Sequence, residues 1–389
     1  MSIAVIAQRS GLPPCIMVSK HMGAVRSLVE ADLPALARLF QKVFYSREST
    51  PSSALEAYLG GLYLPPINGD GGIESKVYVA DSGAIVGFCG VNELPMTING
   101  RPIRAAAFSS LMVDSAQADA TAAGRLMRTL RQGAQDFSFS ETASATSVAM
   151  WKGLRGSVLP LHSLDWLRIF DPLQFTLDLA RQRVPTLGVL APVLAPFDRL
   201  IRKGGVAPES WRLRPIQART WFEERELDTA GTAELVQRFA ADYSLAPAWP
   251  PEALKRKIED AASKSLLGPM TSRVVTGAEG RLIGFFIYHG RRGRVGRVLQ
   301  LLALPNQTGA VLDCMFSHAS TAGLVGLRGR SDPALLDAAR ERQLIFTSRA
   351  ATVVDSRDPE IVEALQRGSV LLHGLAGEIW SRLHFDVLG

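Results

Sequence analysis

The chain has 389 residues, more than one hydrophobic core usually supports, so two domains are expected. Hydrophobic residues make up 47% and charged residues 21%, a composition that excludes a disordered chain. The formal net charge of +6 favours anionic partners such as nucleotide phosphates or acidic lipids. No nucleic-acid-binding motif accompanies this charge, so nucleic acid is not expected as a partner.

The cysteines and histidines argue against a metal site. The three cysteines, Cys15, Cys89 and Cys314, form no CxxC pair, and the six histidines show no paired spacing. This pattern predicts a reducing compartment, no disulfide framework and no metal. No apolar run reaches the ~20 residues that span a bilayer, and we expect a cytoplasmic protein.

Periodicity predicts an α/β fold, with mixed sheets flanked by helices, after a disordered lead-in at residues 1–23. The predicted elements of the first half are a strand at 25–28, a helix at 31–44, a hairpin of strands at 76–80 and 84–91, a strand at 103–113, a helix at 124–135 and a strand at 137–140. Asn99-Gly100 predicts a tight turn before the strand at 103–113.

Residues 181–210 form a basic linker rich in proline and glycine. One interpretation is a connector packed across two domains. The other is a segment, residues 184–203, that lies on a membrane surface with apolar side chains in the interface and basic ones beside anionic head groups. The second interpretation would place the protein at the inner face of the membrane.

The second half repeats a pattern of the first. Ser75-Lys76-Val77 and Ser272-Arg273-Val274 are each followed by a turn glycine and then by Gly-Phe, at a constant offset of 197. An offset near half the chain length is typical of a duplicated domain. We therefore predict two tandem domains, at residues 24–180 and 211–389.

The segment 111–128 carries the clearest signal for chemistry. An apolar strand runs into a loop of small residues, which opens an amphipathic helix at Gly124-Arg125. Such a loop presents backbone N–H groups, and the helix adds its positive N-terminal end, so the pattern is typical of a phosphate site.

This segment resembles the central motif of the GCN5-related N-acetyltransferases (GNAT), a strand of the form LxVxP followed by Arg/Gln-x-x-Gly-x-Gly/Ala and a helix. Leu111, Val113 and Gly124 match the motif, and the element order over residues 24–173 agrees with the family. Two positions depart from it, since Asp119 stands where the family has Arg or Gln and Ala122 stands where it has the first Gly.

The resemblance implies acyl-CoA (acetyl-CoA or longer) as co-substrate, without a metal. It implies that the backbone of three strand residues pairs with the pantetheine arm and that the loop and helix start hold the pyrophosphate. The residues so implied are Leu111, Met112, Val113, Thr121, Ala122, Ala123, Gly124 and Arg125. The family's last helix commonly carries a tyrosine that protonates the leaving thiolate, but Trp151 or Lys152 stands there in this chain.

Acyl transfer to an amine needs a proton acceptor. The candidates are Glu141, at the end of the fifth strand, and Glu93, just after the third.

Elsewhere, His162 to Arg168 is interpreted as packing. The basic turn at 290–297 is interpreted as a solvated hairpin tip or an anion contact, and the cluster at 368–380 as a lining of the cleft between the domains.

The leading hypothesis is therefore an N-acyltransferase that moves an acyl group from acyl-CoA to a primary amine. The acceptor is a small molecule or a lipid-like amine, since ceramide-forming N-acyltransferases belong to the same superfamily. The alternative is a GNAT-fold binding protein that has lost catalysis, and a weaker one is a nucleic-acid binder inferred from charge alone.

Overall fold

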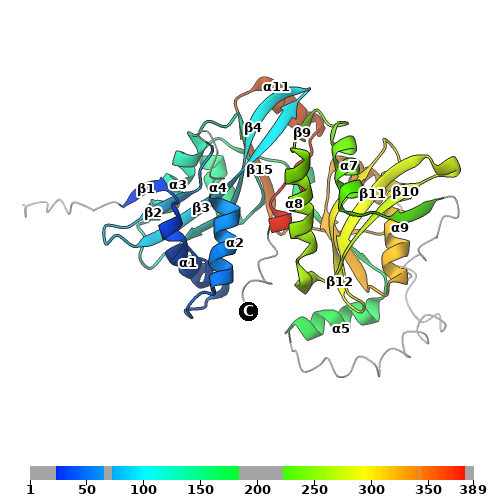
Figure 1. Cartoon of the computed structure of the whole chain (residues 1–389), viewed down its shortest axis with the longest axis horizontal. Coiled ribbons are helices and arrows are strands. Elements are labelled where there is room, and N and C mark those ends of the chain that lie inside the picture. Colours follow the sequence, from blue (N-terminus) through cyan, green and yellow to red (C-terminus); the bar gives the residue numbers. More distant parts are fainter. Residues whose placement is uncertain (1–22, 65–71, 184–221, 341, 382–389) are drawn as a thin grey trace, which may run out of the picture.

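The computed structural model describes residues 23–64, 72–183, 222–340 and 342–381. The predicted lead-in, apart from Gly23, and the linker beyond residue 183, including the segment 184–203, lie outside the described residues. The described chain forms two mixed sheets side by side, each with helices on its faces (Figure 1). No helix in the described ranges combines the length and the apolar character needed to cross a bilayer.

The first sheet is antiparallel except for one central pair. Its strands, in spatial order, are β1 (Ala24–Ser27), β2 (Lys76–Val79), β3 (Ile85–Ile98), β4 (Arg101–Val113), β5 (Phe137–Ala143), β15 (Ala351–Ser356) and β6 (Ser157–Val158). β4 and β5 are the parallel pair. A short strand, β9 (Leu245–Pro247), pairs with the far end of β3.

The second sheet has the same order of equivalent strands. They are β8 (Glu223–Glu226), β10 (Met270–Thr276), β11 (Leu282–His289), β12 (Val295–Ala303), β13 (Gly326–Arg330), β7 (Asp165–Ile169) and β14 (Ile345–Thr347). β12 and β13 are its parallel pair. The hairpins β2–β3 and β10–β11, which carry the sequence repeat, take equivalent places. The predicted α/β class and tandem arrangement are confirmed.

The two halves exchange a strand. β15 comes from the second half of the chain and pairs with β5 of the first sheet, whereas β7 comes from the first half and pairs with β13 of the second. The predicted domains, at 24–180 and 211–389, therefore divide the sequence but not the two sheets. Each sheet contains one strand from the other predicted domain. Nothing in the local sequence of either strand signals the exchange.

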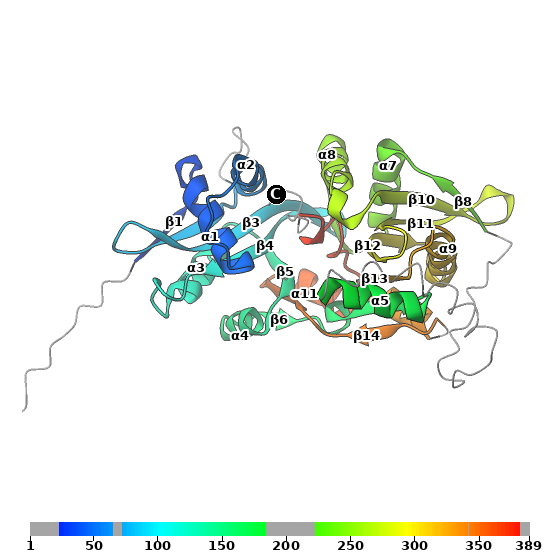
Figure 2. The same ribbon diagram turned by 90° about the horizontal axis from the view of Figure 1, so that it is seen from below.

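Helices cover both faces of each sheet. In the first half, α1 (Leu33–Tyr45) and α2 (Ser53–Tyr63) pack on one face, and α3 (Ala122–Arg131) and α4 (Ala145–Gly153) pack on the other. The remaining helices are α5 (Pro172–Arg183), α7 (Thr229–Ala240), α8 (Pro251–Ala262), α9 (Thr308–Thr321), α10 (Pro333–Ala339) and α11 (Pro359–Arg367). In Figure 1, α8 stands between the two sheets and α5 lies below the second half, and in Figure 2, seen from below, α5 lies in front of that half.

Local chemistry explains several boundaries. Asn99 and Gly100 have φ angles of 47° and 84°, the left-handed pair that a two-residue hairpin between β3 and β4 requires. The Ser52 and Ser144 hydroxyls accept backbone N–H groups and so begin α2 and α4. The helix predicted at 124–135 begins earlier and ends at Arg131, and α2 was not predicted.

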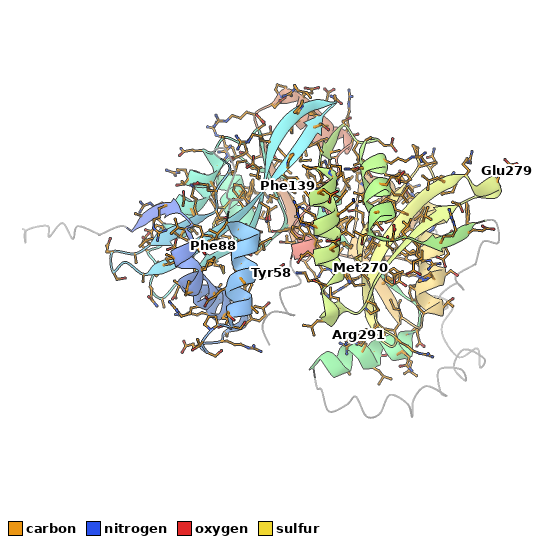
Figure 3. All side chains as sticks on the ribbon, in the orientation of Figure 1. Tyr58, Phe88, Phe139, Met270, Glu279 and Arg291 are labelled. Atoms are coloured by element: carbon orange, nitrogen blue, oxygen red, sulfur yellow. The ribbon has the colours of Figure 1, made fainter. Side chains whose placement is uncertain are left out.

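The largest hydrophobic core joins the two sheets. It includes Phe139 of β5, Phe285 of β11 and Leu372 near the end of the chain, all fully buried. Figure 3 places Phe139 where the two halves meet. The halves therefore share a core in addition to the exchanged strands, and we expect them to unfold together.

Trp166→Ala tests this coupling. The Trp166 side chain on β7 is 1% exposed, and its Nε1 donates to the Arg330 carbonyl (2.9 Å). Its removal should lower the free energy of unfolding by about 3–5 kcal/mol and shift one cooperative transition, measured by calorimetry and circular dichroism.

Leu161→Ala, at a side chain that is 50% exposed, is the control and should stay within about 0.5 kcal/mol of wild type. Two separate transitions, of which Trp166→Ala moves only one, would contradict a shared unfolding unit.

Candidate functional site

The two parallel strands of the first sheet separate soon after they meet. They pair only from Ala105↔Phe137 to Ala107↔Phe139. Beyond these pairs β4 continues along β3, and β5 continues along β15. The divergence leaves backbone edges of β4 and β5 facing each other without the ladder that would satisfy them.

A β-bulge lies on β4 at the divergence. Ser110 and Leu111 together oppose Cys89 of β3, because Gly90 pairs with Ser109 while Phe88 pairs with Met112. Ser110 has φ of 50°, a left-handed conformation that is uncommon for serine. Bulges and strained residues of this kind often turn backbone and side-chain groups toward a functional site.

A cavity of about 330 Å³ opens at the divergence. It is lined by Val43, Phe44, Cys89, Phe108, Ser109, Ser110, Leu111, Val113, Ala123, Met127, Ser140, Thr142, Ala143, Ser144, Thr146, Ser147, Met150, Trp151 and Glu378. Met127 and Trp151 belong to helices on one face of the sheet, and Phe44 belongs to α1 on the other. The cavity therefore reaches both faces of the sheet through the gap between β4 and β5.

A buried tyrosine supports the bulge. The Tyr63 hydroxyl, at the end of α2, lies 3.0 Å from Ser109 Oγ and 2.7 Å from Ser110 Oγ. Burial raises the pKa of Tyr63 to about 12, so the phenol keeps its proton at neutral pH. A Cβ at Gly90 would come within 2.3 Å of the Tyr63 ring, so only glycine leaves room for it there.

The carboxylate in the cavity wall comes from the other half of the chain. Glu378 is 2% exposed, and its Oε1 accepts hydrogen bonds from Ser140 Oγ (3.1 Å) and from Thr142 Oγ1, both on β5. The Glu378 charge contributes to the raised pKa values of Cys89 and Tyr63, after the larger effect of burial. Among the described lining residues, Glu378 alone has an ionisable carboxyl or basic side chain.

Glu141, a predicted proton acceptor, points to the backbone that carries Glu378. Its Oε1 accepts the N–H groups of Glu378 (2.6 Å) and Ile379 (2.7 Å), and its Oε2 lies 3.0 Å from His373 Nδ1. Burial raises the pKa of Glu141 to about 7 against the opposing effect of Arg330 and the two N–H groups. The side chain is fully buried and is not among the residues that line the cavity.

A polar cluster between the halves surrounds Glu141. Arg330 of β13 donates to the Glu141 carbonyl (2.5 Å) and to Thr352 Oγ1 (3.1 Å). The rings of His162 and His373 lie 5.3 Å apart, and burial lowers the pKa of each to about 3. Both histidines are therefore neutral at physiological pH. In the described chain, no three His, Cys, Asp or Glu side chains are arranged to hold a metal ion.

Among the predicted strand residues, Leu111 and Val113 line the cavity, whereas Met112 is buried in the core under α1 and α2. The backbone of Met112, to which the prediction refers, continues the strand between them.

The predicted loop and helix residues also differ in whether they line the cavity. Ala123 lines the cavity, Ala122 is buried in the core, and Thr121 is exposed at the N-cap of α3. Gly124 is exposed, and a Cβ there would have no atom within 4 Å. Space for a ligand is therefore present at the start of α3.

The predicted phosphate ligand Arg125 has protein partners. Its guanidinium donates to the Gly23 carbonyl (2.6 Å) and to the Tyr78 hydroxyl (3.2 Å). Tyr78 in turn donates to Asp119, whose carboxylate also accepts the Thr121 N–H (2.8 Å). The Thr121 hydroxyl also donates to this carboxylate and, ahead of Tyr78 and the Thr121 N–H, lowers the pKa of Asp119 to about 2. The residue that departs from the family motif is therefore ionised and held in the loop.

Glu93, the other predicted proton acceptor, lies outside the cavity lining. Its Oε1 accepts from Arg104 Nε (2.8 Å), and its Oε2 accepts from the Ile73 N–H (3.1 Å). These contacts describe a partly exposed surface carboxylate tied to the neighbouring strand.

The equivalent place in the second half is closed. Ser109 and Ser110 are the second and third residues after the last paired residue of β4, and Leu299 and Gln300 stand at the same distance in β12. The Leu375 N–H donates to Gln300 Oε1 (3.2 Å), and a Cβ at Gly374 would lie 2.2 Å from the Leu299 carbonyl. The chain itself thus lies against this strand.

The helix that follows is also covered. A Cβ at Gly309, in the first turn of α9, would lie 2.6 Å from the Arg342 guanidinium, which is bound to Asp313 (2.8 Å). The start of α3 has open space at Gly124, whereas the start of α9 is occupied by this side chain.

Sequence reasoning missed two residues of the site, Tyr63 and Glu378. The cluster at 368–380 was expected to line the cleft between domains, and the structure places it between the two sheets, but no local signal selects Glu378 within it. Tyr63 ends a helix that was not predicted, so its relation to Ser110 could not be inferred.

Of three comparisons with known proteins, only the one with solved structures found similar proteins. No family model matches the chain, and no curated protein matches its sequence. Among solved structures, a GCN5-related N-acetyltransferase from Kribbella flavida is 14% identical, with a TM-score of 0.51 over 88% of this chain and 74% of that one. A probable N-acyltransferase from Enterococcus faecalis V583 is 8% identical, with a TM-score of 0.55 over 89% and 74%.

The N-myristoyltransferase of Saccharomyces cerevisiae, solved with bound myristoyl-CoA and inhibitors, is 12% identical, with a TM-score of 0.50 over 90% and 86%. These similarities span both sheets. The chain therefore has the fold of the GNAT superfamily, in a divergent tandem form.

The buried histidine pair predicts sensitivity to acid. Unfolded His162 binds a proton below pH 6.5, whereas folded His162 stays neutral down to about 3, so stability falls as the pH drops through this window. At pH 5 the loss from this residue should be roughly 2 kcal/mol.

Urea unfolding of wild type and His162→Gln at pH 7 and pH 5 measures this loss of stability. The variant has no imidazole at position 162, so it should lose less stability at pH 5 than wild type does. An identical change with pH in the two proteins would show that His162 is not held neutral by the fold.

Proposed function

We propose that the protein is an N-acyltransferase that uses acyl-CoA and acylates a primary amine in the cavity between β4 and β5. The observation that carries the proposal is a cavity that crosses the sheet at a bulge and adjoins the open N-terminus of a helix. A thioester can enter from one face and an amine from the other, so the two reactants meet at the strand divergence.

The donor is assigned to the first half. The diverging edge of β4 offers backbone groups to the amides of a pantetheine arm, as an added strand would. The pyrophosphate would lie at the N-terminus of α3, where Gly124 leaves space and the helix end favours negative charge. The equivalent strand and helix start in the second half are occupied by residues of the chain itself.

The chemistry follows from ordinary aminolysis of a thioester. A neutral amine attacks the carbonyl carbon, the N–C bond forms, the C–S bond breaks, and the CoA thiolate leaves. The nitrogen becomes positively charged when the N–C bond forms, so it must lose one proton, and one proton must reach the thiolate. Backbone N–H groups at the bulge would stabilise the oxyanion, because they are already oriented where β4 is irregular.

We assign the proton-accepting role to Glu378, because its carboxylate lies in the cavity wall. Glu141 becomes a positioning residue, since its carboxylate binds the backbone N–H groups of Glu378 and Ile379. Glu93 has no part in this assignment. For the thiolate, we assign the proton donor to the Ser110 hydroxyl, which lines the cavity and lies beside the Tyr63 phenol.

We further propose a long acyl chain on the donor and a lipid-like amine as the acceptor. The similarity to a structure that contains myristoyl-CoA makes a long acyl chain worth testing beside acetyl. Peripheral contact with an anionic membrane through residues 184–203 is a further proposal, to be tested with liposomes and a deletion of that segment.

Ligand binding can be tested by thermal stability in CoA, acetyl-CoA and palmitoyl-CoA. A ligand at about 100 times its dissociation constant should add about 2.7 kcal/mol to the free energy of unfolding. Gly124→Trp should abolish this gain without destabilising the free protein, because the position is open. If none of the three compounds stabilises the protein, a GNAT-fold binding protein without acyltransferase activity becomes the better description.

Glu378→Gln tests the proton acceptor. The amide keeps the shape and the hydrogen bonds from Ser140 and Thr142 but cannot take a proton, so kcat should fall about 10²–10⁴-fold, while the affinity for acyl-CoA is unchanged. The rate of acyl transfer to a good amine acceptor is measured from the release of free CoA thiol, across a range of pH.

Glu141→Gln is the matched comparison, since its remaining oxygen can still accept the two N–H groups. It should retain much more activity than Glu378→Gln, whereas Glu141→Ala should lose both stability and rate. Equal losses in the two glutamine variants would contradict the division of roles.

A further inference from the structure

The wall of the cavity on the α1 side is apolar and partly open. Val43 and Phe44 line it from the last turn of α1, with side chains 36% and 43% exposed. The Phe44 ring packs edge-on against Phe40, with ring centroids 5.1 Å apart, so the exposed ring is held in place. Large hydrophobic side chains that stay exposed beside a cavity favour contact with an apolar ligand.

The charged neighbours of this wall are balanced. Lys42, on the same turn of α1, pairs with Asp114 at the end of β4 (2.7 Å). The rest of the described lining consists of apolar and hydroxyl side chains, apart from Glu378, so the wall provides one buried negative charge. One carboxylate can compensate one ammonium group.

From these observations we infer that the acceptor carries a single primary amine on an uncharged, largely apolar body. A second ammonium group beside Val43 and Phe44 would lose part of its hydration and would find no second carboxylate among the described lining residues, which is costly in a partly buried site. An alkyl chain would instead gain contact with both side chains. Polyamines and other polycations are thus poor acceptors. This inference rests on the proposed function and specifies its substrate class.

The hydroxyl groups of the cavity lie on the opposite face from this wall. Ser144, Thr146 and Ser147 line the cavity near the start of α4, on the face where the donor is assigned, and each can donate and accept hydrogen bonds. They suit the amides of the pantetheine arm and add no second carboxylate for the acceptor.

Hexylamine and 1,6-diaminohexane are the matched test pair, because they differ only in the second terminal amine. With a saturating donor, kcat/KM for hexylamine should exceed that for the diamine by at least about tenfold. In a series from butylamine to octylamine, kcat/KM should rise with each methylene that reaches the apolar wall.

Phe44→Asp should reverse the preference by placing a second carboxylate where the second ammonium lies. The ratio of kcat/KM for hexylamine to that for the diamine should fall at least about tenfold. Val29→Asp is the control, since Val29 is 50% exposed in the same half, does not line the cavity and gains the same charge. Its ratio should equal that of wild type.

The outcomes separate the two proposals. If acyl-CoA does not bind and no amine is acylated, the proposed function fails. If amines are acylated but wild type uses the diamine as well as hexylamine, the single-amine inference fails while the acyltransferase stands. Should Phe44→Asp fold poorly, Phe44→Ala serves instead, and an unchanged dependence on alkyl length in that variant overturns the role of the apolar wall.

Discussion

The divergence of β4 and β5 is the constraint on which the rest of the molecule depends. Two parallel strands that separate after a few pairs leave backbone N–H and C=O groups without partners in the middle of a sheet. Buried backbone groups in proteins are normally hydrogen-bonded. In this fold something must lie in the gap. In the first sheet the gap is a cavity, and in the second the chain near Gly374 and Leu375 lies against the corresponding strand.

One segment of backbone, residues 370–379, contacts both the closed gap of the second sheet and the open gap of the first. Val370 and Leu371 pair with β9 of the first sheet, and Gly374 and Leu375 lie against β12 of the second. The chain then reaches β5, where Glu141 accepts two consecutive N–H groups and holds Glu378 in the cavity wall. A Cβ at Gly377 would lie 2.1 Å from Glu141 Oε1, so glycine is needed for this approach. The second half thus completes the site of the first, and among the described residues the gap between the parallel strands is open in the first sheet and closed in the second.

Local patterns were enough to predict the elements of the first sheet. The hairpins, the central strand and the helix after the small-residue loop each depend on neighbours in the sequence, and they occur with shifted boundaries. The exchange of β7 and β15 could not be predicted, because a short apolar strand is compatible with the edge of either sheet.

Glu141 was singled out by its place at a strand end, but its orientation depends on backbone more than two hundred residues away. Arg125 was predicted as a phosphate ligand, and its partners, Gly23 before β1 and Tyr78 on β2, are distant in the sequence.

A structure with a non-hydrolysable acyl-CoA thioether analogue would locate the donor site. We expect the pantetheine arm between β4 and β5, the pyrophosphate at the start of α3 near Gly124, and the acyl carbonyl position beside Ser110 and Leu111 within reach of Glu378. A ligand bound against β12 and α9 in the second half, or on the outer surface away from the strand divergence, would contradict this placement.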